Sequence, residues 1–156
     1  MLTTVTTFAA PAGVSGMQIF GAVTLSGLAL ASAICLLAGL RGSKKIKIDS
    51  PDKAAWWGII TGTLWEVAGG TWADLANGLG SISKGALGGD GFGDPGLGGT
   101  ALALTAIAFA FDWKRLVIPA LLGLSAAVVY GEAGGIWGIG VNIIRMVAGK
   151  LTGGAG

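Results

Sequence analysis

The chain has 156 residues, of which 53% are hydrophobic and 12% charged, and its mean hydropathy is +0.75. Because soluble domains carry about 25% charged residues, this composition excludes most soluble enzymes and charged disordered tails. One cysteine excludes a disulfide within the chain, and a scattered net charge of +2 gives no indication of nucleic-acid binding. A membrane protein or a hydrophobic subunit of a larger assembly remains.

Residues 1–16 have no basic n-region, which predicts a retained, flexible lead-in rather than a cleaved signal peptide. Residues 17–40 are uncharged and mainly apolar, and a helix of this length would reach about 36 Å, enough to cross a hydrocarbon core of about 30 Å. Gly27 and Ala31 form a small-xxx-small pair. This spacing predicts close packing against another helix, although it also fits a segment in which small residues are simply abundant.

A basic loop, residues 41–53, follows this first helix. By the positive-inside rule the loop is cytoplasmic, and the N-terminus is then outside. The cations are either ordinary solubilising charges or contacts for anionic lipid headgroups, worth about 1 kcal/mol per basic residue. The candidates for headgroup contact are Arg41, Lys44, Lys45 and Lys47.

A helix start is predicted at Ser50, Pro51 and Asp52. These residues supply a capping hydroxyl, a proline suited to the first helical position and an acid near the positive end of the helix dipole. The tryptophan-rich helix that begins here is predicted over residues 54–82.

Two placements of this second helix remain open. Residues 54–73 would span the membrane with Glu66 near mid-depth, which the tryptophans at both ends favour, or the whole helix would lie along the membrane interface. Gly58 and Gly62 are predicted as helix-packing positions. Together, residues 17–82 form the first helical pair.

The second half of the chain begins with residues 83–99, whose polar, glycine-rich sequence predicts a linker. Residues 100–150 are predicted to form the C-terminal helices, and residues 151–156 a flexible tail. The charged sequence at residues 112–115 leaves two arrangements of residues 100–131 open: a shallow hairpin, or one long helix that packs against protein rather than lipid.

If the chain crosses the membrane five times, the positive-inside rule places every basic residue except Lys84 on one side of the membrane. The sequence therefore predicts an all-α, polytopic helical membrane protein. It would have about 4–5 hydrophobic helices, an external N-terminus and a glycine-rich loop in the middle.

No pattern of residues typical of a catalytic, metal or cofactor site is present, and the chain has no histidine. We therefore predict no enzymatic activity, no metal and no cofactor. Glu66, Asp112 and Arg145 form a possible intramembrane polar site, because charged side chains within a membrane usually pair or face a polar cavity. For Glu66 the alternative is a position on the polar face of an interfacial helix.

These features favour a non-enzymatic structural or pore-forming subunit that self-associates in a membrane, with lipid and copies of itself as partners. The layout is analogous to that of small membrane proteins of phages and mobile elements, such as holins and conjugative pilins, but no motif identifies a family. Two alternatives stay open: a small ion or proton channel or transporter that uses Glu66, and a hydrophobic subunit of a virion or filament.

Overall fold

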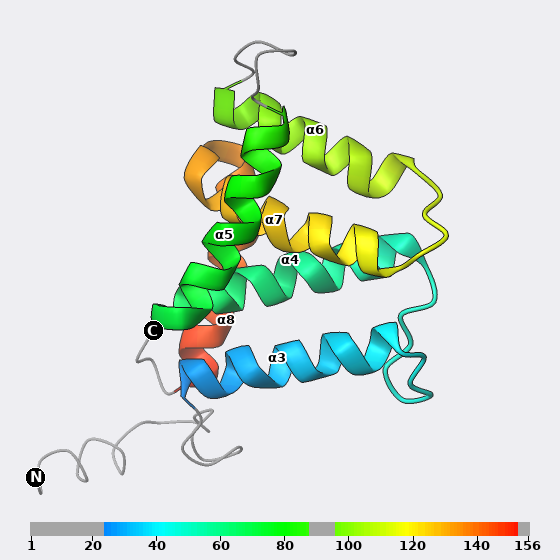
Figure 1. Ribbon diagram of the computed structural model, residues 1–156. Helices are drawn as coiled ribbons and strands as arrows, with labels where there is room; N and C mark the ends of the chain where they lie inside the picture. Colours follow the sequence, from blue (N-terminus) through cyan, green and yellow to red (C-terminus); the bar gives the residue numbers. More distant parts are fainter. Residues whose placement is uncertain (1–23, 88–95, 153–156) are drawn as a thin grey trace, which may run out of the picture.

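The computed structural model describes residues 24–87 and 96–152, which form six α-helices and, within these ranges, no strand (Figure 1). The prediction of an all-α fold is therefore confirmed. Residues 1–23, 88–95 and 153–156, which include the lead-in, the centre of the linker and most of the tail, lie outside the described residues. The helices are α3 (Leu25–Leu40), α4 (Pro51–Ala68), α5 (Gly70–Leu87), α6 (Gly96–Ala110), α7 (Val117–Ala133) and α8 (Gly135–Leu151).

Side-chain caps begin the first two described helices. The Thr24 hydroxyl accepts a hydrogen bond from the backbone N–H of Gly27 (3.1 Å) at the start of α3. At the start of α4, the Ser50 hydroxyl accepts one from the N–H of Lys53 (3.3 Å), and Pro51 is the first helical residue. The helix start predicted at residues 50–52 is thus confirmed, because these caps satisfy N–H groups that have no partner within the helix.

The helix predicted over residues 54–82 is two helices, α4 and α5. The chain turns at Gly69 and Gly70, whose φ angles of 72° and 54° lie in the left-handed region that glycine adopts without a steric penalty. Glu66 consequently lies in the last turn of α4 and not near the middle of a long helix. The linker is also shorter than residues 83–99, since α5 extends to Leu87 and α6 begins at Gly96.

Residues 100–131 do not form one long helix. The helices α6 and α7 are separate, and residues 111–116 connect them. Pro119 lies in the first turn of α7, where its missing N–H costs no helical hydrogen bond. Asp112 is exposed on the connecting segment.

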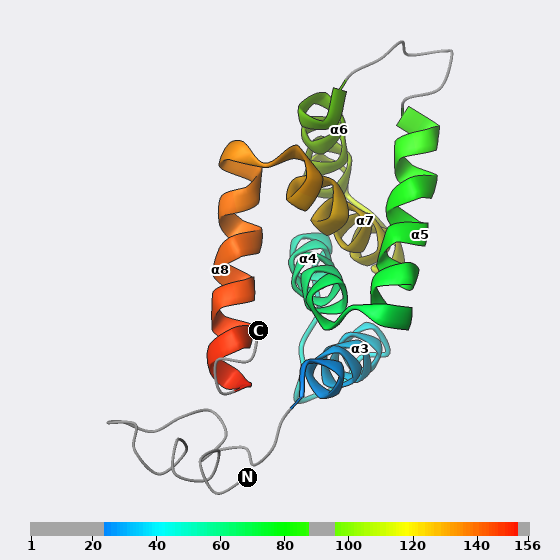
Figure 2. The same ribbon diagram turned by 90° about the vertical axis from the view of Figure 1, so that its left-hand side faces the viewer.

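Four helices, α3, α4, α7 and α6, lie side by side in one layer in that order, and α4 and α7 run in the same direction (Figure 1). The remaining two, α5 and α8, run across one end of this layer on its two sides, as the end-on view shows (Figure 2). The loops 41–50 and 111–116 both lie at the other end (Figure 1). The last helix therefore runs across the end of the layer and does not return along it. That it makes a fifth membrane pass stays a prediction.

The two halves of the chain repeat one unit of three helices. The sequence Ala-Gly-Gly-x-Trp occurs at residues 68–72 and again at residues 133–137, at the α4–α5 and α7–α8 junctions. In the second junction Gly134 and Gly135 have φ angles of 64° and 54°, close to those in the first. Viewed end-on, α3, α4 and α5 are related to α6, α7 and α8 by an approximate twofold axis between α4 and α7 (Figure 2).

Glycines let α4 and α7 approach closely on this axis. A Cβ atom on Gly58 would lie 2.1 Å from the carbonyl oxygen of Ala120, and one on Gly123 would lie 2.1 Å from that of Ala55. The offset that takes Ala68 to Ala133 also takes Gly58 to Gly123 and Ala55 to Ala120, so the two contacts are symmetry equivalents. The result is a central helix, α7, that is buried without interruption over residues 123–130.

Candidate functional sites

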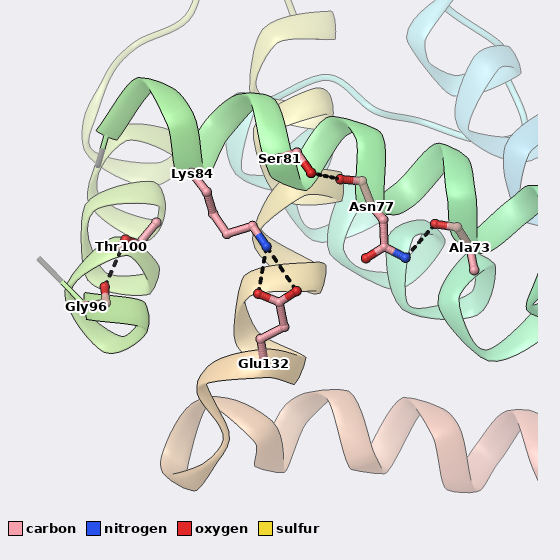
Figure 3. Close-up of polar contacts among 7 residues, drawn as sticks. All are labelled: Ala73, Asn77, Ser81, Lys84, Gly96, Thr100 and Glu132. Carbon is pink, nitrogen blue, oxygen red and sulfur yellow. Dashed lines mark hydrogen bonds and ion pairs between the residues drawn. The ribbon is translucent and has the colours of Figure 1, made fainter. Parts of the chain in front are cut away.

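Two ion pairs connect the repeats at the end of the layer where α5 and α8 lie. Arg145 on α8 places its Nη2 atom 3.7 Å from Oε2 of Glu66 on α4. Lys84 on α5 places its Nζ atom 2.8 Å from Oε2 of Glu132 on α7 (Figure 3). Each pair thus joins the layer helix of one repeat to the crossing helix of the other.

The Glu66–Arg145 pair is the more buried of the two. The Glu66 side chain is 15% exposed and that of Arg145 44% exposed. Within the described residues Glu66 Oε2 is buried and accepts no hydrogen bond. Gly131 on α7 lies beneath both groups, since a Cβ atom there would be 3.4 Å from Glu66 Oε2 and 3.5 Å from Arg145 Nη2. A small residue at this position therefore leaves room for the pair.

Asp112 is not part of this site. It lies on the 111–116 segment at the opposite end of the layer, whereas Glu66 and Arg145 are brought together. Sequence reasoning did not propose Lys84 or Glu132, which form the neighbouring pair, as site residues. The repeated Ala-Gly-Gly-x-Trp sequence was the signal that could have placed the ends of α4 and α7, and hence these acids, side by side.

The four predicted packing positions fall into two groups. Gly58 and Gly62 face α7, and a Cβ atom on Gly62 would lie 2.6 Å from the carbonyl oxygen of Leu124. Gly27 and Ala31 are exposed on α3, and within the described residues a Cβ atom on Gly27 would meet only the hydroxyl of Thr24. Packing at these two positions stays a prediction about contacts with another molecule.

An apolar groove of about 560 Å³ lies between α4, α6 and α8. Trp56, Ile60 and Ile143 line it, and its few polar atoms include the hydroxyls of Thr105 and Tyr130, which are hydrogen-bonded to each other (2.6 Å). Tyr130 also stacks on Trp137 with the ring centroids 5.3 Å apart. The groove offers contact to an apolar group and little hydrogen bonding.

The basic residues predicted to contact headgroups are all in the described part of the chain. Arg41, Lys44, Lys45 and Lys47 are exposed in the loop between α3 and α4. Asp49 of the same loop forms an ion pair with Lys53 in the first turn of α4, and the pKa of this carboxyl is lowered, first by the hydrogen bond and then by the charge of Lys53. The loop thus keeps one acid ionised beside its cations.

None of the described helices is, alone, both long and apolar enough to cross a bilayer. The helices α7 and α8 together satisfy the requirement of length and composition, but they meet at a bend of 112°. Two further helices, α3 and α6, are apolar and shorter, with 16 and 15 residues.

Among residues 24–87 and 96–152, no group of three or more cysteines and acids is placed to hold a metal ion. Comparisons of the chain with protein-family models, with curated proteins and with solved structures gave no match.

Proposed function

We propose that this chain is a non-enzymatic integral membrane subunit that self-associates as a structural or pore-forming component. The observation that carries the proposal is the distribution of charge along the four-helix layer. Of its helices, α3 and α6 contain no charged residue, and those of α4 and α7 lie in the terminal turns. Helices with uncharged middles are compatible with hydrocarbon, in which a charged side chain is costly.

The positions of the cations support the same proposal and give an orientation. Both segments that join helices at the far end of the layer are basic, and this end holds every lysine and arginine except Lys84, Arg145 and Lys150. By the positive-inside rule this end is cytoplasmic. The layer helices, 15–18 residues long, reach about 22–27 Å. They are a few ångströms short of an average bilayer, which local thinning accommodates.

The exposure of apolar side chains supports both embedding of the chain in a membrane and association of its copies. Large apolar side chains are exposed on all six described helices, and soluble monomers rarely expose extensive apolar patches. The centre of the layer is closed, because α4 and α7 meet there without room for a methyl group. A pore would therefore be lined by several copies and not by one.

Carbonate extraction of membranes from cells that express the full chain tests the proposal. We expect the chain to stay in the membrane pellet and, after mild cross-linking, to give multiples of its mass. Complete release into the carbonate supernatant contradicts membrane embedding. Particles that sediment without lipid would indicate a virion or filament subunit instead.

A second candidate is ion or proton transfer that uses Glu66. It is favoured by the burial of this carboxylate, whose Oε2 accepts no hydrogen bond from the described residues. Reconstituted vesicles distinguish the two functions. If ion flux is present in the wild type and lost in Glu66→Gln with the oligomer intact, transport is supported. If the wild type shows no flux, the structural function is supported.

A further inference from the structure

The loop between α3 and α4 is fixed in place. Ile48 is buried and packs on Leu36 and Ala54, and a Cβ atom on Gly39 would lie only 2.4 Å from its Cδ1 atom. Nearby, the Ser43 hydroxyl accepts hydrogen bonds from the N–H groups of Lys45 (3.3 Å) and Ile46 (3.4 Å). The lysines of this loop are therefore presented from an ordered backbone.

A hollow of about 530 Å³ opens in this loop beside the end of α3. Two of the four predicted headgroup residues, Lys44 and Lys47, line it, whereas Arg41 and Lys45 do not. The acid that lines it, Asp49, is already paired with Lys53. The hollow thus has an excess of positive charge and is complementary to an anion.

Exposed apolar side chains also lie along α3, the helix whose C-terminal end borders this hollow. Leu30, Ile34 and Leu37 are 51%, 57% and 60% exposed, and their spacing puts them on one face of α3. Because α3 is at the edge of the layer, no other described helix covers this face (Figure 1). A cationic hollow at the end of a helix with exposed apolar side chains matches a molecule that has an anionic head and hydrocarbon chains.

We propose that this hollow binds the phosphate headgroup of an anionic phospholipid through Lys44 and Lys47. The inference rests on the proposed membrane location and adds a specific lipid partner and site to it. Lys114 and Arg115, in the other loop at the same end of the layer, extend the positive surface to further headgroups.

The test compares the thermal stability of the full chain in detergent micelles after addition of phosphatidylglycerol or of neutral phosphatidylcholine. We expect phosphatidylglycerol alone to raise Tm, by about 4–8 °C for two lysines near the phosphate. The increase should shrink as salt screens the charges. An equal effect of the two lipids on the wild-type chain overturns the proposal.

Variants locate the effect. The variant Lys44→Gln/Lys47→Gln should lose most of the Tm increase that phosphatidylglycerol produces. The variant Lys114→Gln/Arg115→Gln should lose a smaller part of it. The matched control, Lys84→Gln/Lys150→Gln, removes two cations at the opposite end and should keep the increment. If the Lys44/Lys47 variant keeps the full Tm increase, the proposal is overturned. It is also overturned if inorganic phosphate raises the Tm of the wild-type chain as much as phosphatidylglycerol does, because this would identify a site for the free ion.

The failure of this inference is distinguishable from failure of the proposed function. A chain that resists carbonate extraction but shows no preference for phosphatidylglycerol leaves the membrane location intact and contradicts only the headgroup site. A chain released by carbonate contradicts both.

Discussion

Replacing the central glycines tests whether the close approach of α4 and α7 holds the fold together. In Gly123→Ala the added methyl group would lie 2.1 Å from the carbonyl oxygen of Ala55, and in Gly58→Ala it would lie 2.1 Å from that of Ala120. These oxygens belong to helical backbone, so a flexible side chain cannot move aside to relieve the clash. The helices have to separate, and overpacking of this kind costs up to about 3 kcal/mol.

For a chain of this length we expect Tm to fall by about 2–12 °C in each variant. The approximate twofold axis adds a sharper expectation, namely that the two variants lose the same free energy of unfolding within about 0.5 kcal/mol. Tryptophan fluorescence during heating in detergent micelles measures the Tm and the free energy of unfolding of each variant. Gly78→Ala in α5 is the control, because a Cβ atom there meets nothing within 4 Å and the change should raise stability by up to about 1 kcal/mol. If Gly123→Ala behaves like this control, the glycine contact does not determine the packing.

Three further predictions concern the crossing helices. In a double-mutant cycle of Glu66→Gln and Arg145→Gln, we expect a coupling of about 0.5–1 kcal/mol, since Arg145 is largely exposed to solvent; zero coupling would show that the pair is not formed. Gly134→Ala should lower the free energy of unfolding by about 1–3 kcal/mol, because φ 64° and ψ −152° are strained for alanine, and an unchanged Tm contradicts this turn geometry. Gly140→Leu, which adds a side chain to the groove, should raise Tm more than Gly78→Leu, which gains helix propensity alone; equal effects would indicate that the groove is not available to be filled.

The sequence was sufficient to predict the helical class, because long uncharged apolar segments and the cap at Ser50 are local signals. It was also sufficient to identify Gly58 and Gly62 as positions that face another helix, although not which helix. The turn after Ala68 was missed. An apolar pattern continues through Gly69 and Gly70, and only the backbone angles distinguish a helical glycine pair from a break.

Topology was harder to predict than helix content. The positive-inside rule assumes that each helix crosses the layer, whereas α5 and α8 run across its end. In the structure the two loops lie together at one end of the layer, and Arg145 lies at the other end beside Glu66. The side of the membrane on which each lies stays a prediction. The pairing of Arg145 with Glu66 depends on the 112° bend between α7 and α8, which brings α8 back over α4. No local pattern encodes such an angle.

The repeat also explains why a groove lies beside α8. In the first repeat, α5 packs closely on α7 because a Cβ atom on Gly80 would lie only 2.9 Å from the Val128 side chain. The Ser125 hydroxyl of α7 also donates a hydrogen bond to the carbonyl of Leu79 (3.2 Å). The equivalent of Gly80 in the second repeat is Arg145, whose side chain extends to Glu66 and spaces α8 from α4. The equivalents of Ser125 and Leu79 are Ile60 and Ile144, and both line the groove. One arginine at a glycine position thus gives the twofold layer an ion pair, a groove and a difference between its two sides.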